Sequence, residues 1–348
     1  MSPDSERESA LVAAAAGGSH EAFRRLVEPL GQELHLFCYR MLGSFHDAED
    51  VLQEARLKAW KGLGRFDGRA SFRTWMYRIA TNAALDALKS RRRRVVPQDL
   101  VEARDPSRGL GEPRHDIPWL EPYPDAHLPS TPHDAVELRE SVRLAFIRAL
   151  QMLPPRQRAI LILRDVLDWS AAEVADGLDT SVAAVNSALQ RARATVRDHS
   201  PRDPLPGSGG ELERRKAELM ERYVAAWEAG DVDAVVAMLT DDATHAMPPW
   251  AAWFAGRTAL RSLYSAYPVW GGGPPRPGLF RVVPFDMNGE PGFAEYCRTD
   301  PEGPYHALAL TVATVNPGGT LMAAKTSFVD AALFAPFGLP ETLQEAPA

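Results

Sequence analysis

The chain has 348 residues, of which 45% are hydrophobic and 24% charged, and its 39 Lys and Arg against 46 Asp and Glu leave a formal net charge of −7. This length predicts two or three domains, and the composition is that of a globular rather than a disordered chain. Two cysteines exclude a disulfide framework and a cysteine-only zinc site, and no apolar run reaches the ~18 residues that cross a bilayer.

The negative charge is unevenly distributed. Residues 1–98 have a net charge of +4 and residues 141–200 of +2, whereas residues 99–140 have −6 and residues 201–348 have −7. Because screening confines charge effects to roughly 10 Å at physiological salt, the acidic segments do not exclude nucleic-acid binding by the basic ones. The N-terminus lacks a basic segment followed by an apolar one, so we expect no secretory signal and a cytoplasmic protein.

Residues 1–19 are expected to form an N-terminal tail, and residues 20–96 a first helical block. In residues 47–60, alanine and leucine recur at spacings of four and three, which predicts a helix with one buried stripe. Another face carries an acidic ridge of Asp47, Asp50 and Glu54, with Gln53 beside it. Ordinary capping near a helix N-terminus and docking of a basic partner both explain such a ridge.

The next helix begins near Ser71 and runs to Lys89. Its polar face carries Arg78, Asn82, Asp86 and Lys89, and four arginines follow at residues 91–94. Such a face suits base edges and phosphates, although a solvated surface helix has the same composition. The preceding loop, residues 65–70, combines Phe66 with arginines, a mixture that suits an extruded base.

Residues 97–133 contain eight prolines and an excess of acid, so we expect a linker without one regular element. Residues 134–198 return to helical periodicity. Ser170 and Glu173 form a capping box, residues 179–181 a turn, and residues 182–197 a longer helix with Asn186, Gln190 and Arg193 on its outer face. This pattern predicts a helix-turn-helix, and a helical hairpin without DNA contact is the alternative.

A second linker is expected over residues 199–210, a further domain over residues 211–337 and a C-terminal tail over residues 338–348. The domain begins with three predicted helices, at residues 211–230, 232–239 and 256–264. Four strand-like runs follow, at residues 281–285, 293–299, 306–315 and 321–329. This order predicts an α+β domain.

Taken together, the segments at residues 47–54, 71–82, 153–158 and 170–193 resemble regions 2 and 4 of a bacterial sigma factor of the sigma-70 superfamily, in its extracytoplasmic-function (ECF) group. The resemblance spans roughly residues 20–198 and implies a subunit that binds core RNA polymerase and promoter DNA to start transcription. It implies that the coiled coil of the polymerase β′ subunit binds a surface of this chain formed by Asp47, Glu49, Asp50, Gln53 and Glu54. The β subunit is implied as a further partner.

The resemblance also assigns DNA-binding roles. In region 2, the residues for the −10 element are Arg65, Phe66, Arg78, Asn82, Asp86, Lys89, Arg91 and Arg92. In region 4, Asn186, Ser187, Gln190 and Arg191 are expected at bases of the −35 element and Arg193 on phosphate. The linker sequence Trp119-Leu-Glu-Pro-Tyr-Pro-Asp125 is associated with a subgroup that carries an extra C-terminal domain, and such acidic linkers thread through polymerase.

Residues 211–337 resemble the SnoaL-like cone of polyketide cyclases and ketosteroid isomerases. The expected fold class is therefore multidomain, with all-α regions 2 and 4 followed by an α+β SnoaL-like domain. A possible pocket of that domain consists of His245, Trp250, Trp253, Tyr296 and His306. We expect this domain to regulate the sigma factor, with a small-molecule ligand as an open option, and expect no cofactor and no metal.

Two rival hypotheses stay open on the residues alone. One is a cyclase- or isomerase-type enzyme with a DNA-binding arm, and the other is an ordinary helix-turn-helix repressor. Neither class needs both the acidic ridge and the two DNA-binding blocks, which favours the sigma factor.

Overall fold

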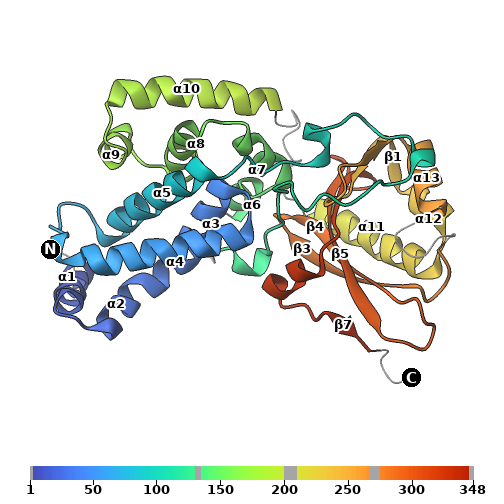
Figure 1. Cartoon of the computed structure of the whole chain (residues 1–348), viewed down its shortest axis with the longest axis horizontal. Helices are drawn as coiled ribbons and strands as arrows, with labels where there is room; N and C mark the ends of the chain where they lie inside the picture. The colour runs from blue at the N-terminus through green and yellow to red at the C-terminus, as the bar shows by residue number, and fades with distance from the viewer. Residues whose placement is uncertain (1–2, 130–134, 200–209, 267–274, 345–348) are drawn as a thin grey trace. The chain divides into compact units, whose positions relative to one another are not determined.

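The computed structural model describes residues 3–129, 135–199, 210–266 and 275–344. It divides into two compact units (Figure 1). The helical unit comprises Met1–Arg93, His127–His133 and Ala145–Ser200, and the sheet unit comprises Arg94–Ala126, Asp134–Leu144 and Pro201–Ala348. Residues 200–209 of the predicted second linker, 130–133 of the first and 345–348 of the predicted tail lie outside the described residues.

The first block of the helical unit contains five α-helices. They are α1 (Pro3–Ala16), α2 (His20–Val27), α3 (Gly31–Leu42), α4 (Phe45–Gly62) and α5 (Phe72–Ser90), with short 3-10 turns η1 (Glu28–Leu30) and η2 (Leu63–Arg65) between them. Ser19, Ser44 and Ser71 cap α2, α4 and α5 by accepting a backbone N–H in the first turn. The helix expected from Ser71 is therefore present and begins at its predicted cap.

Residues 3–16 form α1, where the sequence analysis expected a tail. This helix carries a run of alanine at its C-terminal end and packs against α2 and η2. The Phe72 backbone N–H at the start of α5 donates to Glu8 Oε1 of α1 at 3.2 Å. The helix could not be predicted from hydrophobic periodicity, because its amphipathicity is weak. The contact with α5 stabilises it.

The second block of the helical unit begins with α7 (Leu144–Gln151), α8 (Pro155–Leu161) and the π-turn η6 (Ile162–Val166). Then α9 (Ala171–Gly177) and α10 (Val182–His199) form the expected helix-turn-helix. The capping box of Ser170 and Glu173 is present at 3.2 and 2.8 Å. Asp179 adopts φ of 50° in the turn, a left-handed conformation that aspartate tolerates better than most residues.

A buried arginine joins the two helical blocks. Arg158 of α8 is 3% exposed, and its guanidinium donates to the carbonyl oxygens of Met41, Gln151 and Leu153 and to Gln151 Oε1. Met41 lies at the end of α3, so the bond fixes α8 against the first block. Burial lowers the pKa of Arg158 to about 9, with the charge of Arg93 acting in the same direction.

The sheet unit is a curled sheet with helices against one face. The strand order is β2-β1-β6-β5-β4-β3, and β7 pairs with β5. The strands are β1 (Leu239–Ala246), β2 (Trp253–Ala255), β3 (Phe280–Met287), β4 (Glu290–Cys297), β5 (Tyr305–Val315), β6 (Met322–Phe328) and β7 (Thr342–Leu343). Only β1 and β6 run parallel among these pairs.

Helices α11 (Gly210–Ala229), α12 (Val232–Ala237) and α13 (Arg257–Ser265) belong to this unit, and a 3-10 segment, η8 (Ala331–Phe337), follows the last long strand. Tyr223, Trp227, Leu260 and Tyr264 pack with Phe293 in its hydrophobic core. The four expected strands correspond to β3 to β6. Strands β1, β2 and β7 were not predicted, because they are short or interrupted by polar residues. No described helix is long and apolar enough to span a bilayer.

The proline-rich linker belongs to the sheet unit rather than to an extended connection. Over residues 97–129, the part that the structure describes, its helical elements are the short turns η3 (Pro97–Asp99), η4 (Pro106–Arg108) and η5 (Asp125–His127). The indole N–H groups of Trp253 and Trp250 donate to the carbonyl oxygens of Val101 and Gly111 at 2.8 and 3.1 Å. Leu110 is part of the hydrophobic core of the domain. The linker is therefore packed on the C-terminal domain along much of its length.

The turn between β3 and β4 forms hydrogen bonds with the chain on both sides of α6 (Ala135–Glu140). Its partners are Tyr123 and Asp125 before this helix and Val142 after it. Asn288 and Gly289 have φ of 55° and 65°, as the tight Asn-Gly hairpin turn requires. Asn288 accepts the Tyr123 N–H at 2.8 Å and donates to the Val142 carbonyl at 2.7 Å. The Gly289 N–H donates to Asp125 Oδ1 at 2.9 Å. We call this turn and its partners the hairpin clasp.

Candidate functional site

The acidic ridge lies on α4 of the helical unit. Glu49, Asp50, Gln53 and Glu54 are exposed, as a docking surface requires. The side chain of Asp47 is only 17% exposed and forms an ion pair with Arg91, which follows α5. Four of the five predicted polymerase-binding residues are thus exposed, although Glu54 pairs with Lys58 at 2.7 Å, and Asp47 is the most buried of the five.

Leu57 extends this ridge and was missed in the sequence analysis. It lies on α4 four residues after Gln53, on the same helical face, and its side chain is 55% exposed. A single exposed apolar side chain is common on protein surfaces, so Leu57 adds apolar area to the acidic ridge without identifying an interface by itself. Leu57 follows Asp50 by seven residues and Gln53 by four, and this helical spacing would have predicted its place on the ridge.

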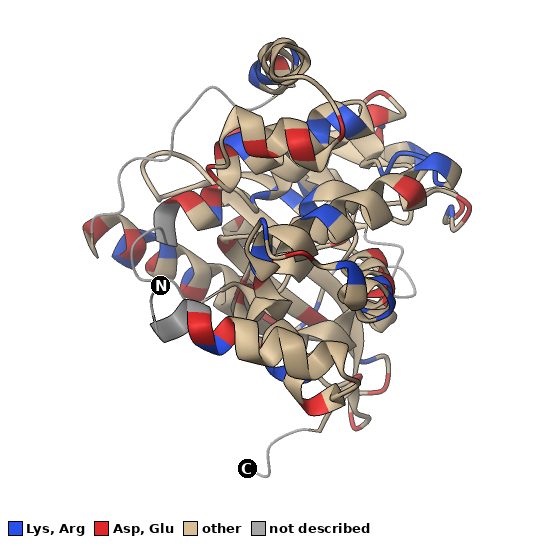
Figure 2. Ribbon diagram, turned by 90° about the vertical axis from the view of Figure 1, so that its left-hand side faces the viewer, with Lys and Arg blue, Asp and Glu red and all other residues tan. Residues whose placement is uncertain are grey.

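The polar face of α5 carries the residues assigned to the −10 element. Asn82 is exposed and faces solvent. Asp86 pairs with Lys89 at 2.8 Å and lies 3.8 Å from Lys58. Along the helices in the view of Figure 2, Lys and Arg are interspersed with Asp and Glu, and no helix carries an unbroken basic stripe. Arg65 and Arg92 are exposed.

A cavity of about 720 Å³ lies beside the loop that was assigned to base capture. Phe66 and the loop after it form one wall, and Val12 and Ala13 of α1 form another. The ring of Phe66 packs against Trp75 at a centroid distance of 5.1 Å, so an aromatic surface backs the cavity. This volume lies within the range of about 300–1,000 Å³ typical of small-ligand pockets.

The outer face of α10 carries the residues assigned to the −35 element. Asn186, Ser187 and Gln190 are exposed, and Arg191 donates to Ser187 Oγ at 2.7 Å. Arg193 is exposed and forms a two-pronged ion pair with Asp165 at 2.6 and 2.8 Å, so its guanidinium is already engaged on the surface of the helical unit. Base-contacting residues of a helix-turn-helix lie at the N-terminal end of its second helix.

Val182 at that end was also missed. It is 45% exposed at the first position of α10. An exposed valine there can contact a thymine methyl group in the major groove.

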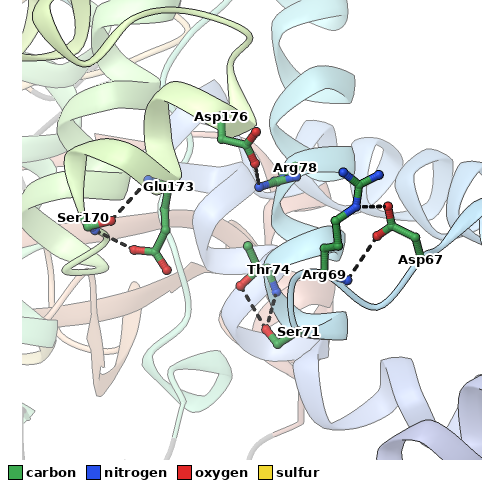
Figure 3. A network of polar contacts seen from close by, with 8 residues as sticks. All are labelled: Asp67, Arg69, Ser71, Thr74, Arg78, Ser170, Glu173 and Asp176. Carbon is green, nitrogen blue, oxygen red and sulfur yellow. Dashed lines mark hydrogen bonds and ion pairs between the residues drawn. The ribbon is translucent and has the colours of Figure 1, made fainter.

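An ion pair connects α5, to which the −10 element was assigned, with α9 of the helix-turn-helix. Arg78 of α5 donates to Asp176 of α9, and Figure 3 shows this pair between the two helices. Beside it in Figure 3, Asp67 holds Arg69, while Ser71 bonds Thr74 at the start of α5. The ring of Tyr77 contacts Trp169 at 5.6 Å. In this arrangement one arginine assigned to the −10 element is covered by region 4.

The five residues of the expected pocket in the C-terminal domain do not come together. His245 is buried inside the sheet, with Tyr264 and Ser327 as partners at 3.2 and 2.9 Å. The two tryptophans bind the linker, as described above. The Tyr296 hydroxyl donates to the Pro340 carbonyl at 3.0 Å and its ring contacts Phe334, whereas His306 is exposed on β5.

The polar groups that accompany His245 are instead Lys325, Glu295, Thr311 and Ser327 from neighbouring strands. The sequence analysis missed them because alternation along β4, β5 and β6 does not show which residues face the helices. Among the described residues, no three His, Cys, Asp or Glu side chains are placed to hold a metal ion.

Comparisons with known proteins follow the same division of the chain. The profile of Sigma-70 region 2 matches residues 26–94, that of Sigma-70 region 4 matches residues 143–196, and that of the SnoaL-like domain matches residues 220–304. The ECF RNA polymerase sigma factor SigG of Mycobacterium tuberculosis is 43% identical over 324 residues, which cover 92% of this chain and 85% of SigG. The chain belongs to the ECF RNA polymerase sigma factors.

Two further relatives agree with this membership. The ECF sigma factor SigW of Bacillus subtilis is 28% identical over 181 residues, or 52% of this chain and 89% of SigW. The crystal structure of M. tuberculosis SigJ has a TM-score of 0.55 and 25% identity, and covers 89% of this chain and 98% of that chain. The predicted family and fold class are confirmed, and this sigma factor takes part in promoter-dependent transcription initiation.

Proposed function

We propose that this sigma factor binds core RNA polymerase through the ridge of Glu49, Asp50, Gln53, Glu54 and Leu57 on α4. The observation that supports this role is an exposed acidic helix face with an apolar side chain at its end. Asp47, bound to Arg91, orients the arginine cluster after α5 instead of contacting polymerase.

Recognition of the promoter follows from the two exposed helix faces. Asn82 and the arginines after α5 contact the −10 element, and a base extruded from it enters the cavity beside Phe66. Asn186, Ser187, Gln190 and Arg191 contact the −35 element. Run-off transcription with purified core polymerase tests this proposal, and absence of a promoter-specific transcript from any candidate promoter, with or without residues 201–348, contradicts it.

The C-terminal domain regulates this activity by holding the linker. The clasp and the indole hydrogen bonds of Trp250 and Trp253 keep residues 94–126 on the domain. Regions 2 and 4 are in contact here through Arg78 and Asp176. Because the −10 and −35 elements are separate stretches of DNA, the two regions have to move apart to bind both. A linker bound to the domain opposes this separation.

The acids of the linker are consistent with this role. Asp116 pairs with Arg114 at 2.7 Å, and Glu121 with Arg94 at 3.0 Å. Asp125 is bound in the hairpin clasp. Threading through the polymerase channel, the role expected for the linker, therefore requires its release from the domain first.

Gly289→Ala tests the regulatory role. A Cβ at Gly289 would lie 2.6 Å from the Arg139 carbonyl oxygen, in a left-handed turn that disfavours any side chain. We expect the variant to release the linker to proteolysis and to raise run-off transcription. Gly303→Ala is the matched control, because a Cβ there meets mainly the flexible side chain of Asp300. Faster linker cleavage without a change in transcription contradicts regulation through the linker.

We extend the regulatory role to a small-molecule ligand inside the C-terminal domain, supported by the buried polar groups around His245. Sigma factors carry out no covalent chemistry on DNA, and we assign no catalytic role to this domain. The cytoplasm remains the proposed location.

A further inference from the structure

A second cavity lies where the linker meets the C-terminal domain, apart from the surfaces assigned to polymerase and DNA. Its volume is about 300 Å³, at the lower end of the range of about 300–1,000 Å³ typical of ligand pockets. All of the residues that line it belong to the sheet unit, and His245 is not among them. We call it the seam cavity, and its size suits a compact molecule.

The linker supplies one wall of the seam cavity, through Arg94 and residues between 115 and 121. These two stretches are bonded to each other. The Leu120 N–H donates to the Val95 carbonyl oxygen at 3.0 Å. The Arg94 guanidinium donates to the Trp119 carbonyl oxygen at 2.6 Å and to Glu121 Oε1 at 3.0 Å. The linker wall is therefore a defined structure and not a loose strand.

The C-terminal domain supplies the other wall, from the ends of two neighbouring strands. Pro248 and Pro249 follow β1, and Val329 and Asp330 follow β6. The Val329 N–H donates to the Pro248 carbonyl oxygen at 2.8 Å and joins the two segments. The Arg114 N–H of the linker donates to the Pro249 carbonyl oxygen at 2.8 Å. Release of the linker would remove one wall, so the seam cavity exists only while the linker is bound.

Most of the side chains that line the seam cavity are apolar. Phe328 and Leu333 come from the domain, and Ile117 and Trp119 come from the linker. The indole N–H of Trp119 donates to the Arg114 carbonyl oxygen at 2.8 Å, which fixes the ring. These side chains favour a ligand with an apolar body, because its burial against them removes apolar surface from water.

The ionisable groups of the lining favour a cation. Two carboxylates, of Glu121 and Asp330, line the cavity with one guanidinium, of Arg94. Arg94 is already bonded to Glu121, so an anion would have to compete for it. The remaining ionisable group, His115, adds little positive charge above pH 7. An ammonium group is therefore attracted to Asp330, and the indole of Trp119 is the ring type that attracts cations most strongly.

We propose that the seam cavity binds a small organic amine in its ammonium form, with its charge at Asp330 and its apolar body against the apolar lining. This inference rests on the proposed hold of the C-terminal domain on the linker. Because both walls contact the ligand, the amine binds the linker-bound state and not the released state. By linkage, the amine stabilises the bound linker and opposes its release.

Isothermal titration calorimetry of the full chain at pH 8 tests the site. Two probes have similar shape and opposite charge, 2-phenylethylamine and 3-phenylpropanoate. We expect the amine to bind with roughly tenfold higher affinity than the carboxylate, because the charge of the lining attracts one probe and repels the other. Absence of amine binding, or equal affinity of the two probes, overturns the proposal.

Asp330→Asn removes the charge of the site and keeps the local structure. Asp330 Oδ1 accepts the Ala332 N–H at 3.0 Å, and asparagine retains this acceptor. Since Asp330 is exposed, we expect a loss of amine affinity of roughly three- to fivefold. Asp300→Asn is the matched control, because Asp300 Oδ1 accepts the Glu302 N–H at 3.0 Å and does not line the cavity. Equal amine affinity of the two variants overturns the assignment.

Amide hydrogen exchange at Arg114 tests the coupling to the linker, because this N–H is bonded to Pro249 of the domain. An amine that binds only the linker-bound state should slow this exchange about tenfold at a concentration ten times its Kd. The Val174 N–H of α9, which donates to the Ser170 carbonyl oxygen at 3.1 Å, is the reference and should not change. Amine binding without slower exchange at Arg114 overturns the coupling.

Run-off transcription with and without 2-phenylethylamine separates this inference from the proposed regulation. Amine binding and slower exchange without lower transcription support the site and contradict regulation through the linker. Absence of amine binding contradicts the site, whereas the Gly289→Ala variant still decides whether the linker regulates transcription.

Discussion

Asp125→Asn should stabilise the hairpin clasp at pH values above the ordinary aspartate pKa near 3.8, with the full gain above pH ~6. Burial raises the pKa of Asp125 to about 6 from its ordinary value near 3.8, and the carboxylates of Asp286 and Glu290 act in the same direction. The hydrogen bond from Gly289 only partly opposes them. Asp125 Oδ2 is buried with no hydrogen-bond partner among the described residues.

The sign follows from linkage. The folded state binds the proton more tightly than the unfolded state, so stability is greatest below pH ~4 and falls as the pH rises through 6. Two units at ~1.36 kcal/mol each give about 3 kcal/mol, an upper limit because Asp125 retains some contact with solvent. Asparagine keeps the acceptor for the Gly289 N–H and never ionises, so it should recover about 1–3 kcal/mol at pH 8.

Amide hydrogen exchange at Tyr123 and Asn288 measures this change, because their N–H groups are bonded across the clasp. At pH 8, 1–3 kcal/mol corresponds to roughly 5- to 150-fold slower exchange in the variant. At pH 3.5, below the ordinary pKa of aspartate, the two proteins should differ little. Asp116→Asn is the control, since Asp116 is exposed and paired with Arg114. Equal protection at pH 8, or the same gain at both pH values, refutes the reasoning.

The remaining predictions concern the helical unit. Asp176→Ala removes the partly exposed ion pair with Arg78, worth ~0.2–1 kcal/mol, and should raise affinity for −10 single strands by up to about fivefold in fluorescence anisotropy. Arg158→Met should lower the free energy of unfolding of this unit by roughly 3 kcal/mol in urea, since each buried acceptor left unsatisfied costs ~1–3 kcal/mol. Asp50→Lys should weaken pull-down of the polymerase β′ subunit, and unchanged recovery would contradict the ridge assignment. Arg191→Ala should cost about 1–3 kcal/mol at one −35 base, whereas an equal loss on all sequences would identify a phosphate contact.

Local signals explain which parts of the fold were predictable. Ser71, Ser170 and Glu173 mark helix starts through bonds within three residues, so their caps could be predicted from spacing alone. Helix α1 could not, because its amphipathicity is weak and its contacts lie with α2 and η2. The candidate interface divides in the same way. Exposure of Asp50, Asn82 and Gln190 follows from helical period, whereas pairing of Arg78 with Asp176 joins residues 98 positions apart.

The sequence by itself determined the family of this protein and the order of its parts, because helical periodicity, caps and motif spacing are written in neighbouring residues. Only the tertiary structure decided where the linker lies and which polar groups share the interior of the C-terminal domain. The hairpin clasp joins Tyr123 to Asn288, and a hydrogen bond in the domain interior joins Tyr223 to Lys325, across 165 and 102 residues of chain. Such contacts depend on strand register and on which face of the sheet is buried, and a one-residue change of register would reverse both.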